Sequence, residues 1–231
     1  MQEDTRAYEE LRVGFTAAVS HELRTPLARL LALLETASLP GADHDELLAQ
    51  AREQVEEMSE LVDDVLFLSE LESGREVVAL GSTPALPVLE DVRDRLADSA
   101  ERADVAIRID AAGDVELPLR RRMLQIVAEN LSENAIRYAG AGSTLTLTAR
   151  PGELEAADDG RGLDADELSR VFERFYRGDR ARASRGTGLG LAIVKHVVTA
   201  AGGAVEASGS PSHGFTVRCR FPLTSGSGSA S

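Results

Sequence analysis

Several features are scarce or absent in this chain of 231 residues, and each excludes something. Cys219 is the only cysteine, so no disulfide can form within the chain. It lies in an alternating, strand-like stretch, and we interpret it as a small packed hydrophobic residue and not as a reactive thiol. No apolar run approaches the about 18 residues that span a bilayer, and no signal peptide opens the sequence. We expect no membrane contact from this sequence and a cytoplasmic location.

Basic residues are also fewer than acidic ones. The chain has 25 Lys and Arg against 39 Asp and Glu, which gives a net charge of −14 and a pI near 4.8. An acidic molecule repels phosphate backbones, so nucleic acid is excluded as a partner of the molecule as a whole. Apolar residues make up 43% and charged residues 28%, as is typical of globular proteins. The length leaves room for two domains, each with its own core.

The first part of the chain has the pattern of a helical hairpin. Apolar residues recur at helical spacing to residue 34, and the turn signal S-L-P-G follows at residues 38–41. A second helix is predicted to start at Asp43, with Glu46 three residues on as in a capping box. Its apolar residues follow a 3-4 heptad spacing: Leu48, Ala51, Val55, Met58, Val62 and Val65. One hairpin cannot bury so wide a face, so we predict that two copies form a four-helix bundle.

Glycine and proline in residues 75–88 predict a linker, followed by a mixed pattern of helices and strands. We divide the chain into a hairpin domain (1–74), this linker, a second domain (89–223) and a flexible tail (224–231). Helices are expected at residues 86–100, 119–138, 164–172 and 190–201, and strands at residues 105–109, 144–148, 153–157, 204–207 and 215–221. Helices segregated from a mostly antiparallel sheet predict an α+β two-layer sandwich.

The stretch F-T-A-A-V-S-H-E-L-R-T-P-L at residues 15–27 carries reactive groups on a helix. His21 has Glu22 beside it, and Thr25 lies one turn further on the same face. A neutral imidazole held by a carboxylate is a competent nucleophile near neutral pH. Taken alone, a His-Glu pair is more often an ordinary surface pair on a helix.

Three stretches of the second domain suit a nucleotide. In N-L-S-E-N-A-I-R-Y (130–138), the amides of Asn130 and Asn134 project from one helix face, and Arg137 follows. Neutral oxygens suit Mg²⁺, and a guanidinium suits phosphate. In D-D-G-R-G (158–162), Asp158 can accept a hydrogen bond from an exocyclic amine such as that of adenine. The glycine-rich G-T-G-L-G-L (186–191) opens a helix and offers amides to phosphate oxygens. Taken alone, the first stretch is more often a polar helix face, the second is usually a β-turn, and the glycine-rich third is a weak signal.

The order and spacing of these stretches resemble those of the sensor histidine kinases of bacterial two-component systems. Residues 15–27 resemble the phosphoacceptor box of that family. The later stretches resemble its ATP-binding domain, which shares its fold with gyrase-, Hsp90- and MutL-type ATPases. The resemblance covers about residues 11–223. It implies a dimeric helical-hairpin domain followed by an α/β two-layer sandwich that binds ATP.

The resemblance also implies roles for individual residues. Those implied at the phosphoacceptor are His21, Glu22 and Thr25. Those implied around ATP are Asn130, Asn134, Arg137, Tyr138, Asp158, Gly160, Gly162, Arg177, Gly186, Thr187, Gly188, Leu189 and Gly190. Asn130 would hold Mg²⁺. The related ATPases have a water-activating glutamate at this position, and an asparagine cannot act as a base. Phe215 departs from the family, which often has a small hydroxyl residue there.

The implied reaction is autophosphorylation of His21 by ATP, followed by transfer to an aspartate of a response regulator. Thr25 further implies phosphatase activity toward that regulator. The implied partners are a second copy of the chain and the regulator's receiver domain, and a longer parent protein would be anchored in the cell membrane. Two alternatives are a hydrolase or serine kinase with the same ATP fold, and a dimeric scaffold that binds ATP without turnover.

Overall fold

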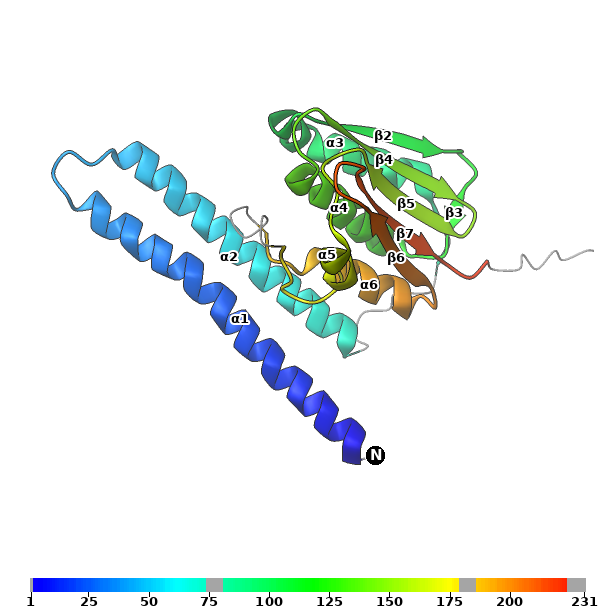
Figure 1. Ribbon diagram of the computed structural model, residues 1–231, viewed down its shortest axis with the longest axis horizontal. Helices are drawn as coiled ribbons and strands as arrows, with labels where there is room; N and C mark the ends of the chain where they lie inside the picture. Colours follow the sequence, from blue (N-terminus) through cyan, green and yellow to red (C-terminus); the bar gives the residue numbers. More distant parts are fainter. Residues whose placement is uncertain (1, 74–80, 179–185, 224–231) are drawn as a thin grey trace, which may run out of the picture. The chain divides into compact units, whose positions relative to one another are not determined.

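The structure is a computed structural model that describes residues 2–73, 81–178 and 186–223; for residues 2–17 and for Glu72 it describes the backbone alone. The chain divides into two compact units (Figure 1). The first contains the residues up to Phe67 together with Gly186 and Thr187, and the second contains the rest, from Leu68 onward. The predicted tail and residues 75–80 of the predicted linker lie outside the described residues.

Two long helices form the hairpin that the sequence predicts. Helix α1 spans Gln2–Ala37 and includes Pro26, and helix α2 spans His44–Glu72. The connection turns at Gly41, whose φ of 82° suits glycine. The side chain of Asp43 accepts a hydrogen bond from the amide of Glu46 at 3.1 Å, which confirms the predicted helix start.

The heptad face of this hairpin lies largely in solvent. Along α2, the exposed fractions are 62% for Leu48, 47% for Val55 and 43% for Val62. Further large apolar residues of the hairpin are exposed as well: Leu27, Leu31, Leu34, Leu39 and Leu66. So many exposed large apolar residues on one hairpin are unusual on a monomer and are typical of an interaction surface.

The second unit is built on a five-stranded sheet with the order β2-β4-β5-β7-β6. Its strands are β2 (Val105–Ala111), β4 (Ser143–Arg150), β5 (Glu153–Asp158), β6 (Ala204–Gly209) and β7 (Phe215–Arg220). Strands β2 and β4 are parallel, and the other pairs are antiparallel. The parallel pair requires a crossover, and a helix lies between the two strands in sequence.

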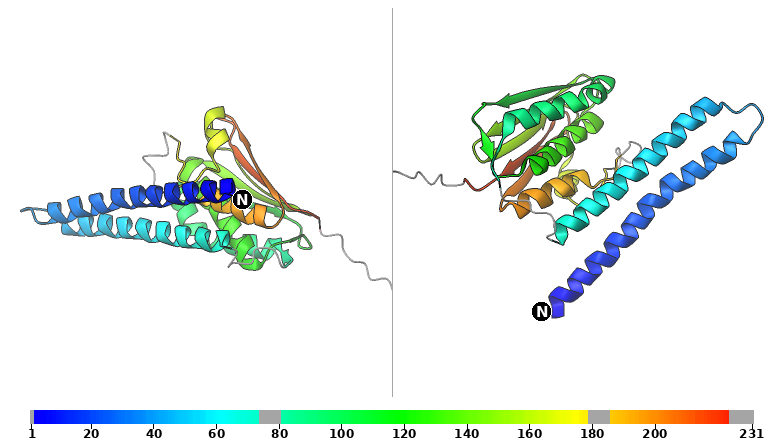
Figure 2. Two further views of the ribbon diagram at one scale, coloured as in Figure 1. Left: turned by 90° about the horizontal axis from the view of Figure 1, so that it is seen from below. Right: turned by 180° about the vertical axis from the view of Figure 1, so that it is seen from behind.

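Helices cover one face of this sheet, as Figure 2 shows. They are α3 (Ala85–Ala103), α4 (Arg121–Tyr138) and α6 (Gly190–Ala200), and the short α5 (Ala165–Arg170) precedes α6 in the chain. Alternate strand residues point into the core between the layers, including Leu145, Leu147, Leu154, Val217 and Cys219. Burial raises the pKa of the Cys219 thiol to about 12, so it is unreactive, as expected.

The other face of the sheet is polar. Neighbouring strands carry paired charges there, with Arg218 against Glu155 and Glu153, and Arg220 against Glu153 and Glu206. An antiparallel sheet with one covered and one solvated face alternates apolar and polar residues in this way. The α+β two-layer sandwich that the sequence predicts is therefore confirmed.

Two short strands were not predicted. Strands β1 (Thr83–Pro84) and β3 (Glu116–Leu117) form a separate antiparallel ladder. The buried hydroxyl of Thr83 donates to the carbonyl of Leu119 at 2.6 Å. Residues 83–88, which the sequence analysis assigned to the linker, thus form β1 and the start of α3. Strands of two residues carry no periodicity, so only the tertiary structure reveals them.

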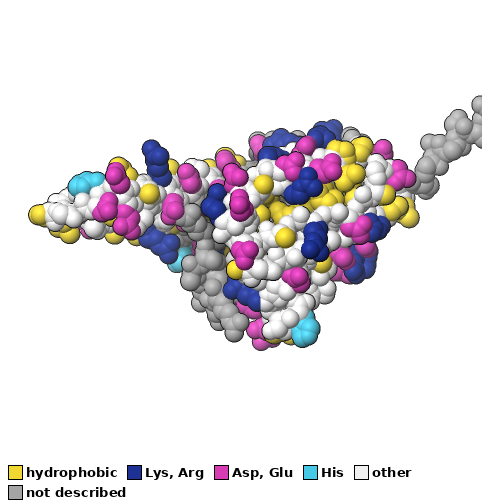
Figure 3. Space-filling view, turned by 90° about the horizontal axis from the view of Figure 1, so that it is seen from above, with side chains coloured by type: hydrophobic (Ala, Val, Ile, Leu, Met, Phe, Trp, Pro, Cys, Tyr) yellow, Lys and Arg dark blue, Asp and Glu magenta, His cyan; other side chains and the backbone are white. Residues whose placement is uncertain are grey.

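No helix in the described ranges is long and apolar enough to cross a membrane. On the face that Figure 3 presents, acidic and basic side chains are interspersed over the surface.

Candidate functional site

Helix α1 presents the phosphoacceptor candidates to solvent. The side chain of His21 is 73% exposed, and its Nδ1 lies 3.7 Å from Oε1 of Glu22. This separation exceeds a hydrogen bond, but a rotation of either side chain would close it. Thr25 is exposed one turn further along the helix. A proton acceptor near Nδ1 leaves Nε2 as the nitrogen that can attack an incoming electrophile.

Helix α4 positions the two carboxamides of the second unit. The Nδ2 group of Asn130 donates to the carbonyl of Ile126 at 2.9 Å, which fixes the orientation of the amide. Its Oδ1 faces Gly190, where an added Cβ would lie only 2.5 Å away. Asn134 lies one turn further and is half-buried. The absence of a side chain at Gly190 therefore leaves room for the Asn130 oxygen.

The glycine-rich loop before α6 is held by the segment after α5. The amide of Phe175 donates to the carbonyl of Gly188 at 2.9 Å. Gly188 has a φ of 69°, and a Cβ there would lie 2.8 Å from the carbonyl carbon of Phe175. Glycine is thus required at this position for two independent reasons. The contact sets where the loop enters α6, beside Asn130.

The loop after β5 is packed against the end of α4. The amide of Arg161 donates to the carbonyl of Ala139, and a Cβ on Gly160 would lie 2.3 Å from the same oxygen. Gly162 has a φ of 63°, and a Cβ there would lie 2.0 Å from the carbonyl of Ser210. Both predicted glycines therefore allow close backbone contacts, one with α4 and one with the β6–β7 hairpin.

Asp158 ends β5 in a partly desolvated position. Its Oδ1 accepts two backbone hydrogen bonds, from Gly160 at 3.0 Å and from Phe215 at 3.2 Å. Burial is the largest influence on its pKa and raises it above 3.8, while these two hydrogen bonds oppose the rise. Among the described residues no hydrogen bond reaches the second oxygen, so it can accept from a donor such as an exocyclic amine.

The two cationic candidates, Arg137 and Arg177, lie near the end of α4 and after α5. Arg137 lies one turn after Glu133 and forms an ion pair with it at 3.2 Å. Arg177 is half-buried after α5. The structure does not show either guanidinium pointing at a phosphate position. Tyr138 ends α4, and its backbone carbonyl accepts a hydrogen bond from the Arg161 side chain.

The candidate residues of the second unit are thus placed at two points along α4, on the helix itself or on segments that contact it. Asn130 and Gly190 define one end, and Ala139, Gly160 and Asp158 define the other. Nine residues of α-helix separate Asn130 from Ala139, or about 13 Å. This arrangement offers a carboxylate acceptor at one end and a carboxamide oxygen with a glycine loop at the other, which suits an adenine nucleotide. The loop residues Gly186, Thr187 and Leu189 are buried.

The residues present fit a magnesium ion held partly by phosphate. In the part of the chain that the structure describes, no group of three His, Cys, Asp or Glu side chains could hold a metal ion. Asn130 offers one neutral oxygen, because its Nδ2 is engaged by Ile126. Mg²⁺ keeps several waters and accepts substrate phosphates as ligands, so one protein oxygen suffices to orient it.

A contribution that the sequence analysis missed comes from the tip of the β6–β7 hairpin. The amide of Gly214 donates to the carbonyl of Gly160, and that of Ser212 donates to the carbonyl of Arg161. A Cβ on Gly214 would lie 1.8 Å from the carbonyl of Asp158. Gly214 could have been noticed as a hairpin glycine, but nothing in the sequence pairs it with residues more than fifty positions earlier.

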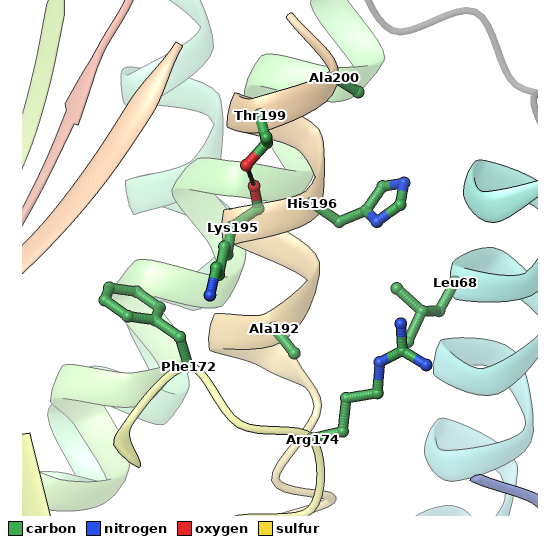
Figure 4. A pocket seen from close by; sticks show the side chains of 8 residues that line it. All are labelled: Leu68, Phe172, Arg174, Ala192, Lys195, His196, Thr199 and Ala200. Atoms are coloured by element: carbon green, nitrogen blue, oxygen red, sulfur yellow. Dashed lines mark hydrogen bonds between the residues drawn. The ribbon is translucent and has the colours of Figure 1, made fainter. Parts of the chain in front are cut away.

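A cavity of about 450 Å³ lies beside α6 in the second unit (Figure 4). Its lining residues are Leu68, Phe172, Arg174, Ala192, Lys195, His196, Thr199 and Ala200. None of them is a predicted site residue. We therefore do not assign the nucleotide to this cavity.

Two family models match the chain. Residues 11–74 match the His Kinase A (phospho-acceptor) domain, and residues 120–225 match the histidine kinase-, DNA gyrase B-, and HSP90-like ATPase. The fold and site thus define a phosphoacceptor hairpin joined to an ATP-binding domain.

The chain belongs to the sensor histidine kinases of two-component systems. It is 33% identical over 231 residues to the sensor-like histidine kinase SenX3 of Mycobacterium tuberculosis, covering 96% of this chain and 56% of that protein. It is 35% identical to the signal transduction histidine-protein kinase BaeS of Escherichia coli, covering 93% and 48% respectively. The chain therefore spans about half the length of these relatives.

Solved structures show the same fold. The Acinetobacter baumannii histidine kinase AdeS matches with a TM-score of 0.72 and 26% identity, covering 88% of this chain and 98% of that chain. The histidine kinase ThkA, solved in complex with the response regulator TrrA, also matches with a TM-score of 0.72. Its identity is 17% and it covers 96% of this chain and 66% of that chain, so this likeness shows the fold alone.

Proposed function

We propose that this chain transfers the γ-phosphoryl group of ATP to His21 and then to an aspartate of a response regulator. The proposal is carried by one observation: the same chain has an exposed helical histidine and a set of residues whose spacing suits an adenine nucleotide. His21 is 73% exposed beside Glu22, and Asn130 and Asp158 mark the two ends of the site.

In this reaction, Nε2 of His21 attacks the γ-phosphorus, the bond to the β–γ bridging oxygen breaks, and ADP leaves. The imidazole proton passes to the carboxylate of Glu22, whose oxygen lies 3.7 Å from Nδ1. The second step moves the phosphoryl group from Nε2 to a carboxylate oxygen of the regulator. Such transfers depend on positioning and charge neutralisation more than on covalent chemistry by the protein.

The identity of Asn130 favours a kinase over a hydrolase. A carboxamide cannot take a proton from water, and its Nδ2 is already engaged with Ile126. With no base at this position, ATP would persist until a better nucleophile reaches it. Mg²⁺ would be held through the Asn130 oxygen and would neutralise charge on the β- and γ-phosphates. Asn134, Arg137, Tyr138 and Arg177 would contact the phosphates or ribose.

The exposed apolar face of the hairpin supports a homodimer. Leu48, Val55 and Val62 repeat on one side of α2 and lie in solvent in a single chain. Pairing with the same face of a second copy would bury both sets in a four-helix bundle. The net charge of −14 disfavours binding to nucleic acid, because the phosphate backbone is also negatively charged.

The partner that receives the phosphoryl group would be a receiver domain. The complex of ThkA with the response regulator TrrA gives a precedent in a protein of the same fold. Thr25, exposed one turn beyond His21, would hold the water for dephosphorylation of that partner. We further propose that the natural parent is longer and anchored in the membrane, because the curated relatives extend well beyond the matched region.

The test is labelling of the purified chain with γ-labelled ATP and Mg²⁺. Label on a phosphohistidine survives alkali and is lost in acid, whereas label on serine or threonine survives acid. We expect His21→Gln to abolish the label, because no other nucleophile occupies its position. The matched control is His44→Gln, which removes an exposed helix histidine of the same unit and should leave labelling within about twofold.

Acid-stable label, or full labelling of the His21→Gln variant, would contradict the kinase assignment. A chain that binds ATP and remains unlabelled, even with a receiver domain present, would instead support the scaffold reading.

A further inference from the structure

The candidate amine acceptor lies in an otherwise apolar row across the sheet. Asp158 is directly opposite Leu145 on one side and Phe215 on the other, and Phe215 is opposite Gly209. Directly opposite residues of antiparallel strands carry their side chains on the same face, with Cβ atoms about 5 Å apart. The row continues to Ile107, which is opposite Leu145 on β2, so Asp158 is the one charged residue among three large apolar side chains and a glycine.

Both apolar neighbours are buried. Leu145 is 1% exposed and Phe215 is 7% exposed, so each faces the core below the sheet. The end of β5 therefore presents its carboxylate between two hydrocarbon walls. Because of this burial, the pKa of Asp158 is raised above 3.8 despite two backbone hydrogen bonds to the carboxylate.

The backbone fixes Phe215 in this position. Its amide donates to Oδ1 of Asp158 at 3.2 Å. The preceding Gly214 has a φ of 74°, and its Cα lies so close to the carbonyl of Asp158 that a Cβ would be 1.8 Å from that oxygen. The backbone at position 215 therefore cannot move away from the carboxylate without breaking the hairpin contact.

Oδ2 of Asp158 can accept a hydrogen bond from the ligand. Oδ1 already accepts from Gly160 and Phe215, and the described part of the chain supplies no hydrogen bond to Oδ2. A desolvated oxygen with one free position discriminates strongly between a donor and an acceptor, because an unpaired buried charge is costly. Water could weaken that discrimination by bridging Oδ2 to an unsuitable group.

We propose that Phe215 is a specificity-determining residue that excludes water from Asp158, so that only a base with an amine at the reading edge is bound. The proposal rests on the proposed function, since it takes Asp158 as the group that reads adenine. A hypoxanthine base carries a carbonyl oxygen where adenine carries its amine. Against a dry carboxylate that oxygen is repelled, whereas a smaller polar residue at position 215 would admit a bridging water.

The experiment measures the Kd of ADP and of inosine diphosphate (IDP) by calorimetry. For the unmodified chain we expect ADP to bind at least about 100-fold more tightly than IDP. In Phe215→Thr the side chain is shorter and polar, so the ratio of the two constants should fall about tenfold. In Phe215→Leu the wall stays apolar, so the ratio should stay within about threefold of the unmodified value.

The matched control is Phe221→Thr. Phe221 is equally buried, at 6% exposed, but follows the far end of β7, where Arg220 is paired with Glu153. This variant suffers a similar loss of core volume and should leave the ADP to IDP ratio unchanged. A general loosening of the sandwich would lower ADP affinity in both threonine variants without separating their ratios.

The outcomes distinguish this inference from the proposed function. If the unmodified chain binds neither nucleotide, the proposed function fails. If it binds ADP but prefers it to IDP by less than about tenfold, the inference is overturned, both for Phe215 and for the reading of the amine by Asp158, while the proposed phosphoryl transfer stands. An unchanged ratio in Phe215→Thr, or a fall of about tenfold in Phe215→Leu, also overturns it. If Phe215→Thr does not fold, the unmodified ratio and the leucine variant still decide.

Discussion

At the scale of single residues, the burial of the Asp158 carboxylate lowers the stability of the fold at neutral pH. Its carboxylate lies between Leu145 and Phe215, and burial raises its pKa. A raised carboxyl pKa means that folding favours the neutral form. The corresponding stability is present below the unfolded pKa of 3.8 and is lost as pH rises through the folded value. At neutral pH the unliganded domain therefore carries a charge that it would be more stable without.

The variant Asp158→Asn tests this placement. Its carboxamide oxygen can still accept from Gly160 and Phe215, which leaves the amide nitrogen where Oδ2 was. We expect a larger free energy of unfolding than in the unmodified chain at pH 7, and no difference below pH 3.8, measured by urea titration. ADP binding should fall by about 10- to 100-fold, because two donors now face each other.

The neighbouring exposed Asp159→Asn provides the control for this prediction. The Oδ1 of Asp159 accepts from the amide of Thr144, a bond that an asparagine can retain. Equal stabilisation by both substitutions would indicate a general effect of removing negative charge. It would contradict a specific desolvation cost at Asp158.

At the scale of elements, the start of α6 and the middle of α4 are matched to each other. The oxygen of Asn130 occupies the space that a side chain at position 190 would fill, 2.5 Å from the position of a Cβ. The orientation of the Asn130 carboxamide on α4 therefore depends on Gly190 at the start of α6, sixty positions later in the chain.

The variant Gly190→Ala should displace the Asn130 amide by about 1 Å. Misplacement on this scale costs roughly 100-fold in rate when positioning dominates catalysis. We expect autophosphorylation to slow by about that factor, while ADP binding without Mg²⁺ stays within about threefold. Single-turnover labelling and calorimetry measure the two quantities. The control is Gly113→Ala, because a Cβ at Gly113 meets no atom within 4 Å. A parallel loss of Mg²⁺-free binding would show that Gly190 acts on the nucleotide and not through Asn130.

At the scale of the whole molecule, the hairpin is incomplete in one copy of the chain. The second unit has a covered sheet face and a buried core, whereas Leu48, Val55 and Val62 of the α2 heptad are exposed. Association of two copies is the simplest way to bury that face. The molecule would then carry two phosphoacceptor histidines and two nucleotide sites.

If the chain forms the proposed four-helix bundle, replacing Leu48 and Val55 with aspartate should convert the dimer to a monomer, because charge at core positions of a bundle is left desolvated. Light scattering coupled to size exclusion measures the mass, with 24.7 kDa expected for the monomer. The control Ala49→Asp places one aspartate at an exposed position outside the heptad face and should leave a dimer; the single variant Val55→Asp, which adds the same charge, is compared with it directly. A monomeric unmodified chain would contradict the four-helix bundle directly.

The sequence by itself determined the fold class and most elements, because their patterns are local. Helical spacing, the cap at Asp43 and alternating strands depend on residues within a few positions of one another. The same holds for the candidates at His21, Asn130 and Asp158, whose motifs are short and ordered along the chain. The three motif-bearing stretches of the ATP site were therefore predictable as sequence features.

Only the tertiary structure decided which residues touch. The ladder of β1 and β3, the packing of Gly190 against Asn130 and the ties from Gly214 to Asp158 join positions far apart in sequence. Hydrogen bonding across a sheet and close approach of backbones leave no periodic trace, because each depends on where two separate segments meet. For the same reason, the sequence shows Phe215 only as a residue that departs from the family pattern. The register between β5 and β7 is what places it opposite Asp158.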